Sequence, residues 1–469
     1  MKLNVNIACG LVALLTSCAT RGPDEPVRVA LPVLFSASGS VEASDAWWEG
    51  FGDPELNRII SGALSNNYTL RAVWDRLAQA EAVAARQGAA LIPSVNAEAS
   101  ASRTRFDTDE ADRAVYENEY GAGLVASYEL DVWGRVRSAR DAAALDVSAT
   151  EGQVQAAAIS LSAEIALTWY QLAEQLGQLE LLHRQIETSK RSLEVLNGRF
   201  RSGQSGAVDV LQQEQLVETR RGDLAVAEAR AQVLKNRLAV LTGVAPGTPM
   251  PVPSALPVTL PEAPATGVPA YTLQRRPDVA RAYDLVKAAD ERVASAIADR
   301  LPRLSLSARV SSTAPEIDDV FSDWIASLAA NLVGPVIDGG SRRAEVARTE
   351  AVRSEAINTY GQTMLEAFAE VEDALTQEQR QRELIVSLDR QLELATQITK
   401  NLRDRYLSGN EDFLRILTAE ISRQSLERNR LQAGRQLIEY RIGLYRALAG
   451  GLETTRPEPA IRLSKEPTL

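Results

Sequence analysis

The five residues RFRSG at positions 199–203 return as RYLSG at positions 405–409, which lie 206 residues further along the chain. The residues that follow also match, because VDVL at 208–211 corresponds to LRIL at 414–417 with the same spacing. Similarity at a fixed, long spacing indicates a repeated structural unit. The sequence therefore predicts two copies of one fold within a single chain.

A proline-rich segment at residues 245–269 separates the two copies. It contains eight prolines and no helical pattern, which indicates an extended linker. We therefore expect a first structural repeat at 53–244, a second at 270–450 and a C-terminal tail at 451–469.

Each repeat shows the same order of elements: helix, strand, strand, long helix, helix. Asp53 is a good N-cap and Pro54 stands just inside the first helix. Apolar and polar residues alternate in the strand segments, so each strand should have one apolar face. Residues 134–202 contain no proline and predict a helix of roughly 68 residues, about 100 Å long. The first and last helices of the repeat together match that length, so we expect them to lie end to end beside it. The expected helices are 54–88, 134–202, 208–241, 270–298, 341–407 and 413–448, and the expected strands are about 94–104, 119–131, 303–312 and 323–335.

The N-terminus has the features of a secretory signal. Lys2, a short apolar run and small residues before Cys18 describe a signal peptide at residues 1–17. Leu15-Thr16-Ser17-Cys18 also fits the lipoprotein pattern, in which the Cys18 thiol receives a diacylglycerol and the new N-terminus is acylated. The alternative is an ordinary signal that contains a cysteine. We expect residues 18–52 to form a lipidated, extended segment.

Composition excludes several classes of function. Cys9 lies in the expected signal, so the mature chain has one cysteine and no disulfide. His183 is the single histidine, and no cluster of metal ligands, nucleophile motif or phosphate loop is present in the sequence. The net charge of -11 argues against binding nucleic acid. We therefore expect no catalytic residues, no metal and no cofactor, apart from the covalent lipid on Cys18.

The four strands suggest a membrane pore. Each has about ten residues and alternating faces, the pattern of transmembrane barrel strands. Four strands are too few to close a barrel, for which about eight are needed. Three copies would supply 12 strands and a helical tube. The expected fold class is thus mainly α with transmembrane β, in which a trimer of duplicated coiled-coil units forms a 12-stranded β-barrel and an α-helical tunnel. The alternative is a periplasmic coiled-coil lipoprotein without a pore and with a structural role.

Five short motifs stand out along the chain: WW at 47–48, FGDPEL at 51–56, DVWGR at 131–135, RRPDV at 275–279 and PVIDGG at 335–340. Together with the duplicated plan of helices and strands, they resemble one family, the TolC-like outer-membrane factors, and especially its lipoprotein branch, which includes OprM and NodT. The resemblance covers nearly the whole mature chain. It implies a homotrimer in the cell outer membrane that works with a periplasmic adaptor protein and an inner-membrane pump, usually of the resistance-nodulation-division type, in the efflux of drugs or other small toxic compounds. Ala19 after the lipidated cysteine is compatible with export to the outer membrane.

The resemblance also implies a periplasmic gate at the two helix–helix turns. Tyr406 resembles a linking residue of the family, Leu414 resembles an apolar constriction residue, and Asp209 resembles a residue that pairs across the tip. Arg415 and Thr418 occupy positions that are often acidic in the family, and the missing acids leave cation binding at the tip an open question. Asp209 and Arg415 have equivalent positions and opposite charges, which suggests a charge latch. The alternative is two solvated side chains near a turn.

Overall fold

The computed structural model describes residues 29–41, 44–106, 115–254, 256, 260–452 and 454–456. Cys18, the expected signal peptide and most of the C-terminal tail lie outside these residues. The described residues fall into two compact units, one within 76–151 and 280–362 and the other within 30–75, 152–279 and 363–456. The long helices run from one unit into the other, and each unit is described by itself.

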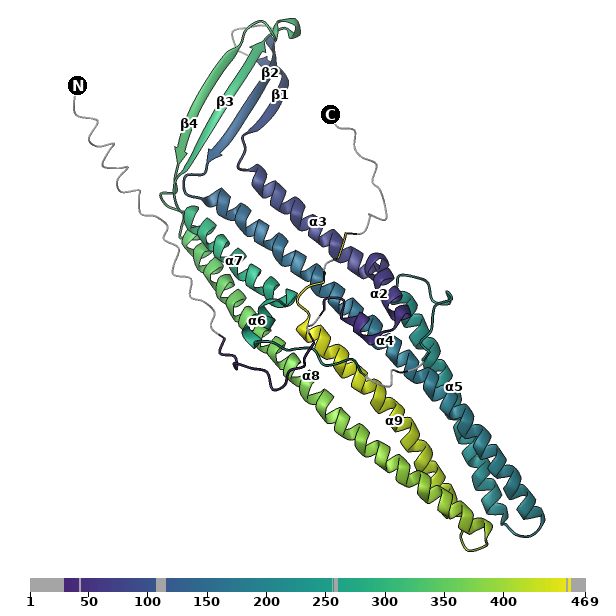
Figure 1. Ribbon diagram of the computed structural model, residues 1–469. Helices are drawn as coiled ribbons and strands as arrows, with labels where there is room; N and C mark the ends of the chain where they lie inside the picture. The colour runs from purple at the N-terminus through teal and green to yellow at the C-terminus, as the bar shows by residue number, and fades with distance from the viewer. Residues whose placement is uncertain are drawn as a thin grey trace. The chain divides into compact units, whose positions relative to one another are not determined.

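The first unit contains a four-stranded antiparallel sheet in the order β1-β2-β3-β4 (Figure 1). The second strand begins at residue 115 rather than 119, because β1 and β2 keep pairing as far as Phe106 and Val115. The fourth strand is shorter than the expected 323–335, because its pairing with β3 ends at Val333. The strands are β1 (Ser94–Phe106), β2 (Val115–Leu130), β3 (Arg303–Ala314) and β4 (Ile325–Val333), and a short 3-10 helix, η2 (Ile317–Asp319), lies between the last two.

The two faces of the sheet differ in polarity. The register places Val95, Ala126 and Leu328 in one row of the apolar face, and Leu328 is 80% exposed. The opposite face carries small polar residues such as Ser127 and Ser307. A sheet with one exposed apolar face fits an apolar environment on that side and water on the other.

The DVWGR motif forms the turn between β2 and the following helix. Gly134 has a φ of 79°, a conformation that favours glycine. The indole Nε1 of Trp133 donates to the carbonyl oxygen of Pro302 at 2.7 Å, which joins this turn to the turn between α7 and β3 of the second repeat. Arg135 makes a bidentate contact with Glu129 at 2.8 Å. The motif therefore fixes the junction between sheet and helices.

Helices make up the rest of the described chain, and two of the expected helices are divided. The helix expected at 54–88 breaks at Asn67, whose ψ of 123° is extended and whose side chain accepts from Leu70 N and donates to Leu241 O. The helix expected at 270–298 divides before Pro277, since proline disfavours a helical residue before it. The helices are η1 (Trp47–Phe51), α2 (Pro54–Asn66), α3 (Tyr68–Ala89), α4 (Arg135–Arg201), α5 (Ala207–Leu241), α6 (Pro269–Gln274), α7 (Pro277–Ala298), α8 (Ser341–Leu407) and α9 (Phe413–Leu448).

The core of the second unit forms around the WW and FGDPEL motifs. Trp47 stacks on Tyr445 with ring centroids 5.7 Å apart. The indole Nε1 of the buried Trp169 donates to Asp53 Oδ2 at 2.8 Å, while Asp53 Oδ1 caps α2 by accepting from the Leu56 amide. Burying one large apolar side chain stabilises a fold by roughly 1.5–3 kcal/mol. These motifs are therefore explained by packing between α2, α4 and α9.

The proline-rich linker is extended and lies against other parts of the second unit. Pro264 forms a single parallel bridge with Val41, and the carbonyl of Pro261 accepts from Arg441. Near the N-terminal end of the described chain, Phe35 stacks on Phe368 of α8 at 5.3 Å. Of the helices that the structure describes, none combines the length and apolar character needed to cross a bilayer.

Candidate functional site at the helix ends

Both long helices end in a glycine turn that leads into a second helix (Figure 1). Gly203 and Gly409 have φ values of 72° and 77°, which only glycine adopts without strain. Each glycine follows the last turn of its helix and terminates it, as the repeated Ser-Gly sequence predicts. The two turns produce the hairpins α4–α5 and α8–α9, whose ends carry all five expected gate residues.

Asp209 caps the start of α5. Its Oδ2 accepts from the Ser205 hydroxyl at 2.9 Å and from the Gly206 amide at 3.2 Å. A carboxylate in the first turn also interacts favourably with the helix dipole. Asp209 thus has a structural role in its own turn.

Arg415 has a different acidic partner from the one suggested by the repeat. Its Nη1 lies 2.9 Å from Glu411 Oε1, four residues earlier in the chain. Arg405 Nη2 approaches the other oxygen of Glu411 at 3.5 Å. In the part of the chain that the structure describes, no contact joins Arg415 to Asp209, so the latch is not formed within one protomer. Sequence reasoning missed Glu411, although its i, i+4 spacing from Arg415 is a known signal for an ion pair.

Tyr406 belongs to an apolar cluster that joins the ends of the two hairpins. Its ring packs on Phe413 at 5.9 Å, and the guanidinium of Arg199 lies 4.6 Å from its centroid. No hydrogen-bond partner of its buried hydroxyl is found among the described residues. The cluster brings together four helices and consists of Leu196, Leu216, Phe413 and Leu417 with Val210 and Tyr406 packed against them.

Leu414 and Thr418 lie on the exposed side of α9. Leu414 is 50% exposed, and its amide donates to Asp412 Oδ1 at 3.2 Å in a helix cap. The Thr418 hydroxyl donates back to the Leu414 carbonyl at 2.9 Å. Neither side chain belongs to the apolar cluster, so both can contact another protein chain.

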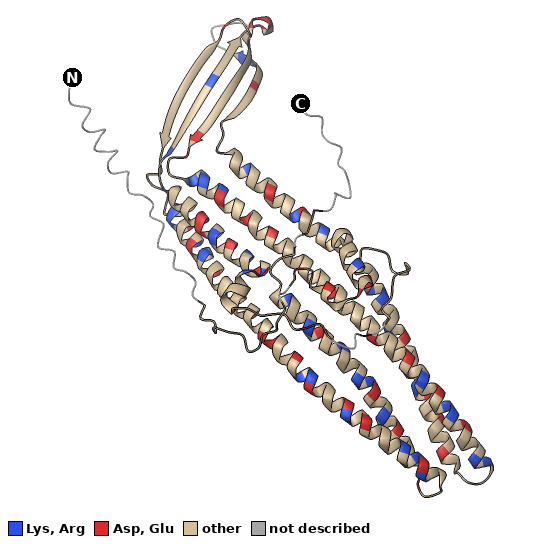
Figure 2. Ribbon diagram, viewed as in Figure 1, with Lys and Arg blue, Asp and Glu red and all other residues tan. Residues whose placement is uncertain are grey.

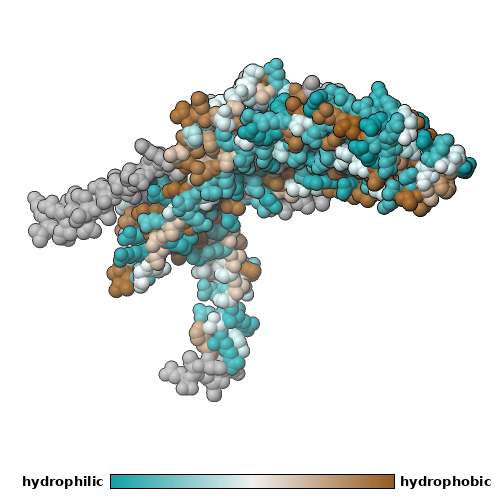
Figure 3. All heavy atoms as spheres, turned by 90° about the horizontal axis from the view of Figure 1, so that it is seen from below, coloured by the Kyte–Doolittle hydropathy of each residue, from teal (hydrophilic) through white to brown (hydrophobic). Residues whose placement is uncertain are grey.

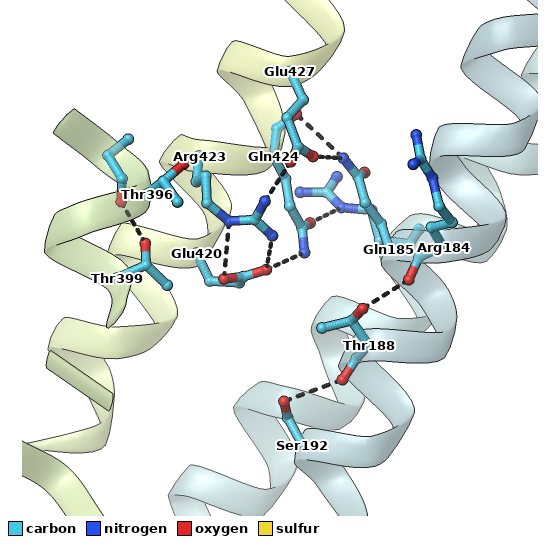
Figure 4. A network of polar contacts seen from close by, with 12 residues as sticks. Arg184, Gln185, Thr188, Ser192, Thr396, Thr399, Glu420, Arg423, Gln424 and Glu427 are labelled. Carbon is cyan, nitrogen blue, oxygen red and sulfur yellow. Dashed lines mark hydrogen bonds and ion pairs between the residues drawn. The ribbon is translucent and has the colours of Figure 1, made fainter. Parts of the chain in front are cut away.

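A buried polar network joins the hairpins above their ends (Figure 4). Gln424 of α9 is fully buried; its Oε1 accepts from Arg220 of α5 at 2.9 Å and its Nε2 donates to Glu420 at 3.0 Å. Gln185 of α4 donates to the Gln424 carbonyl at 3.3 Å and to Glu427 at 3.0 Å. Buried polar groups are costly unless they are paired, so this network fixes how three helices fit together.

Glu420 remains ionised within this network. Burial raises its pKa, but the hydrogen bond and charge of Arg423 and the hydrogen bond from Gln424 outweigh burial, so the pKa lies below its ordinary value. Arg423 contacts Glu420 at 2.6 Å and also contacts Glu427 (Figure 4). Sequence reasoning missed this network, because its contacts from Gln185 and Arg220 come from helices far apart in the chain, although Glu420, Arg423 and Glu427 are spaced as ion pairs on one helix.

Comparisons with known proteins agree with this architecture. The sequence model of the outer membrane efflux protein family matches residues 59–244 and 268–450. The pyoverdine export outer membrane protein OpmQ of Pseudomonas aeruginosa is 32% identical over 440 residues, which cover 90% of this chain and 91% of OpmQ. OpmQ of Pseudomonas putida is 31% identical, and the match covers 94% of this chain and 96% of that protein.

A solved structure shows the same fold. The outer-membrane channel OprN superimposes with a TM-score of 0.85 at 27% identity, covering 92% of this chain and 99% of OprN. These matches span both repeats, and they leave the interpretation as a structural coiled-coil lipoprotein without support. The chain therefore belongs to the outer membrane efflux protein family and is an outer-membrane efflux channel protein, not an enzyme.

Proposed function

We propose that three copies of this chain close into one channel with a 12-stranded barrel. The observation that carries this proposal is the four-stranded sheet, whose outer strands β1 and β4 have no further strand beside them in the described chain. Unpaired strand edges favour association with another sheet. Four strands cannot close a barrel alone, whereas 12 enclose a water-filled lumen.

Exposed apolar side chains on the long helices support the same assembly. On α5, Val226, Val233 and Val240 recur every seven residues and are 51%, 64% and 61% exposed. A seven-residue apolar repeat is typical of a helix that packs along another helix. The surface in Figure 3 shows such apolar patches among hydrophilic side chains. We assign the α5 stripe to contact with a neighbouring copy.

A substitution in this stripe tests the trimer. Val233→Glu places a charge in the proposed contact between copies, and we expect loss of trimer in detergent, measured by light scattering after size exclusion. Gln232→Glu is the matched control, because Gln232 is an exposed neighbour on another face of α5. A Val233→Glu protein that remains trimeric would contradict the proposed contact.

In the cell, the channel is proposed to work with a periplasmic adaptor and an inner-membrane pump of the resistance-nodulation-division type. Similar proteins include the toluene efflux pump outer membrane protein TtgI of Pseudomonas putida, which is 30% identical. The proposed cargo is small toxic organic compounds, including drugs. Crosslinking in cells followed by purification should recover an adaptor and a pump, and recovery of neither would contradict this assignment.

The proposed gate comprises Asp209, Tyr406, Leu414, Arg415 and Thr418 at the hairpin ends. A latch between Asp209 and Arg415 would have to form between copies and would require exchange of their present partners, Gly206 and Glu411. Such exposed pairs are individually worth less than about 1 kcal/mol. Single-channel recordings test it, because Asp209→Ala and Arg415→Ala should both open more often than wild type. Unchanged opening in both variants would eliminate the latch.

The proposed lipid on Cys18 is a supplementary anchor. If the strands supply membrane insertion, a Cys18→Ser variant exported by another signal should still form trimers. Its fraction in outer-membrane preparations and its trimer content can be measured separately. Normal export with complete failure to trimerise would show that the lipid is needed for assembly.

A further inference from the structure

The middle of the polar sheet face carries one pair of opposite charges. Over the described rows from Ser94 to Ser100, the register places only Glu98 of β1 and Arg309 of β3 as charged side chains on this face. Their neighbours there are serine, glycine, asparagine and aliphatic residues. Figure 2 shows how sparse charges are on the strands compared with the helices. Within these rows the pair supplies the charge, and the nearest further acids on this face are Glu119 and Glu129 in the rows beyond.

The pair reaches across an intervening strand. Arg309 Nη2 lies 3.2 Å from Glu98 Oε2, although β1 and β3 are separated by β2. Gly123 of β2 pairs with Glu98 on one side and Ser311 on the other. A Cβ atom at Gly123 would stand 2.9 Å from the Val310 carbonyl oxygen and 3.0 Å from the Ser311 Cβ. A side chain at Gly123 would therefore crowd β3, and the glycine permits the close pairing of β2 with β3 beside the bridge.

Both side chains remain open to solvent. Arg309 is 55% exposed and Glu98 is 51% exposed, and Arg309 Nε also contacts the Ser311 hydroxyl at 3.4 Å. Exposed ion pairs contribute little to stability. Stability alone is therefore a weak reason for a charged pair in the middle of a serine-rich face.

We propose that Glu98 and Arg309 balance each other's charge in the wall of the conduction path, so that solutes of either sign can pass. This inference rests on the proposed trimeric channel, in which the polar face lines the lumen. Three copies place three such pairs around the path. Loss of one partner leaves three like charges, which attract solutes of one sign and repel those of the other.

The local potential can be measured with a thiol reporter in the full-length trimer. Ser307→Cys places the reporter on the same face, two residues from Arg309 on β3, or about 7 Å along the strand. Membrane-impermeant cationic and anionic methanethiosulfonates are added from the outside, so the result does not depend on the periplasmic gate. The ratio of their rate constants reports the sign of the potential, and protein without the Ser307 substitution measures any reaction at Cys18.

Charge substitutions should move this ratio in opposite directions. At about 0.01 M salt we expect Glu98→Gln to lower the cation-to-anion ratio about fivefold and Arg309→Gln to raise it about fivefold. The double variant should return to the starting ratio, and at about 1 M salt all ratios should converge. Arg103→Gln is the matched control, because the register places Arg103 on the apolar face, and it should change nothing.

The outcomes separate the two proposals. If the Ser307→Cys reporter reacts but its rate ratio is unchanged by both single substitutions, or shifts in the same direction for both, charge balancing is wrong and the trimeric channel is unaffected. A double variant that stays shifted overturns charge balancing as well. An Ala308→Cys reporter tests the barrel itself, because Ala308 lies on the apolar face. If that reporter reacts while Ser307→Cys does not, the proposed orientation of the sheet fails.

Discussion

Replacing Glu378 with alanine would leave a buried arginine without its acidic partner. The Arg441 side chain is fully buried and contacts both carboxylate oxygens of Glu378, at 2.8 Å through Nε and at 2.6 Å through Nη2. Removing one member of a buried ion pair costs about 3–5 kcal/mol, because the other charge remains out of water. We therefore expect Glu378→Ala to be strongly destabilising.

The expected shift in melting temperature follows from chain length. Unfolding entropy near 60 °C is about 2.1 cal/mol/K per residue, so 1 kcal/mol corresponds to about 1 °C for a chain of this size. Glu378→Ala should lower the midpoint by about 3–5 °C in intrinsic-fluorescence melting of the detergent-solubilised protein. Glu393→Ala is the control on the same helix. Its ion pair with Arg390 is exposed, so loss of this pair should lower the midpoint by less than about 1 °C.

Charge pairing predicts a further result for a double substitution. Glu378→Leu with Arg441→Met removes both charges and retains much of the apolar volume, so its midpoint should lie well above that of Glu378→Ala. A Glu378→Ala protein that melts within 1 °C of wild type would contradict a large cost for the unpaired Arg441. Equal destabilisation by the single and double substitutions would show that packing, and not the unpaired charge, is responsible.

The same pair predicts the direction of a pH effect. Burial raises the pKa of Glu378, but hydrogen bonds and charges from Arg441 and Arg382 outweigh burial and lower it from 4.5. A lowered folded-state pKa gives stability that is complete above the unfolded value and lost as pH falls through the folded value. Below about pH 4.5, the melting midpoint of wild type should therefore fall more steeply than that of Glu378→Gln.

Three further substitutions test the helix contacts. Asn67→Ala removes the cap of α3 and the hydrogen bond to Leu241, so melting should show a loss of about 1–2 kcal/mol; an unchanged midpoint would contradict the cap. Gln424→Leu retains volume but unpairs the buried network, which should cost about 1–3 kcal/mol and increase amide exchange in α5; unchanged exchange would argue against coupling of the hairpins. Glu411→Gln frees Arg415 for the proposed latch with Asp209, so single-channel recordings should show less frequent opening with little change in melting, and unaltered opening would argue against competition between Glu411 and Asp209 for Arg415.

Local sequence signals predicted most of the secondary structure. The duplication, the alternation in the strands and the glycine turns are properties of neighbouring residues, and each leads to an element in the structure. The break at Asn67 was missed because an asparagine can continue a helix. In the structure the Asn67 side chain caps α3 through the Leu70 amide and also donates to the Leu241 carbonyl, 174 residues away, a contact that no local signal reveals. Pro277, in contrast, carried a local signal for the division between α6 and α7.

The functional residues were harder to predict, because equivalent positions in a repeat need not have equivalent partners. Asp209 and Arg415 correspond in the two copies, yet Asp209 caps its own helix and Arg415 pairs with Glu411. The Glu98–Arg309 bridge could not be predicted from alternation alone. It depends on the strand order and register, which place β2 and its glycine between the two charges.

The distribution of polar contacts along the hairpins indicates where their ends can separate. At the tips, the ion pair and the helix caps lie within one turn of a single hairpin, so they survive if the hairpins move apart. At Gln424, by contrast, contacts reach both α4 and α5 and are buried. Breaking these contacts leaves polar groups without partners, a cost that exposed contacts do not carry. Between the two levels, the apolar cluster around Phe413 joins the hairpins, together with the contact of Arg199 on the ring of Tyr406, and apolar packing is non-directional. The ends of the hairpins are therefore held mainly by apolar packing, which tolerates rearrangement. Separation that extends to the polar network at Gln424 would cost more free energy.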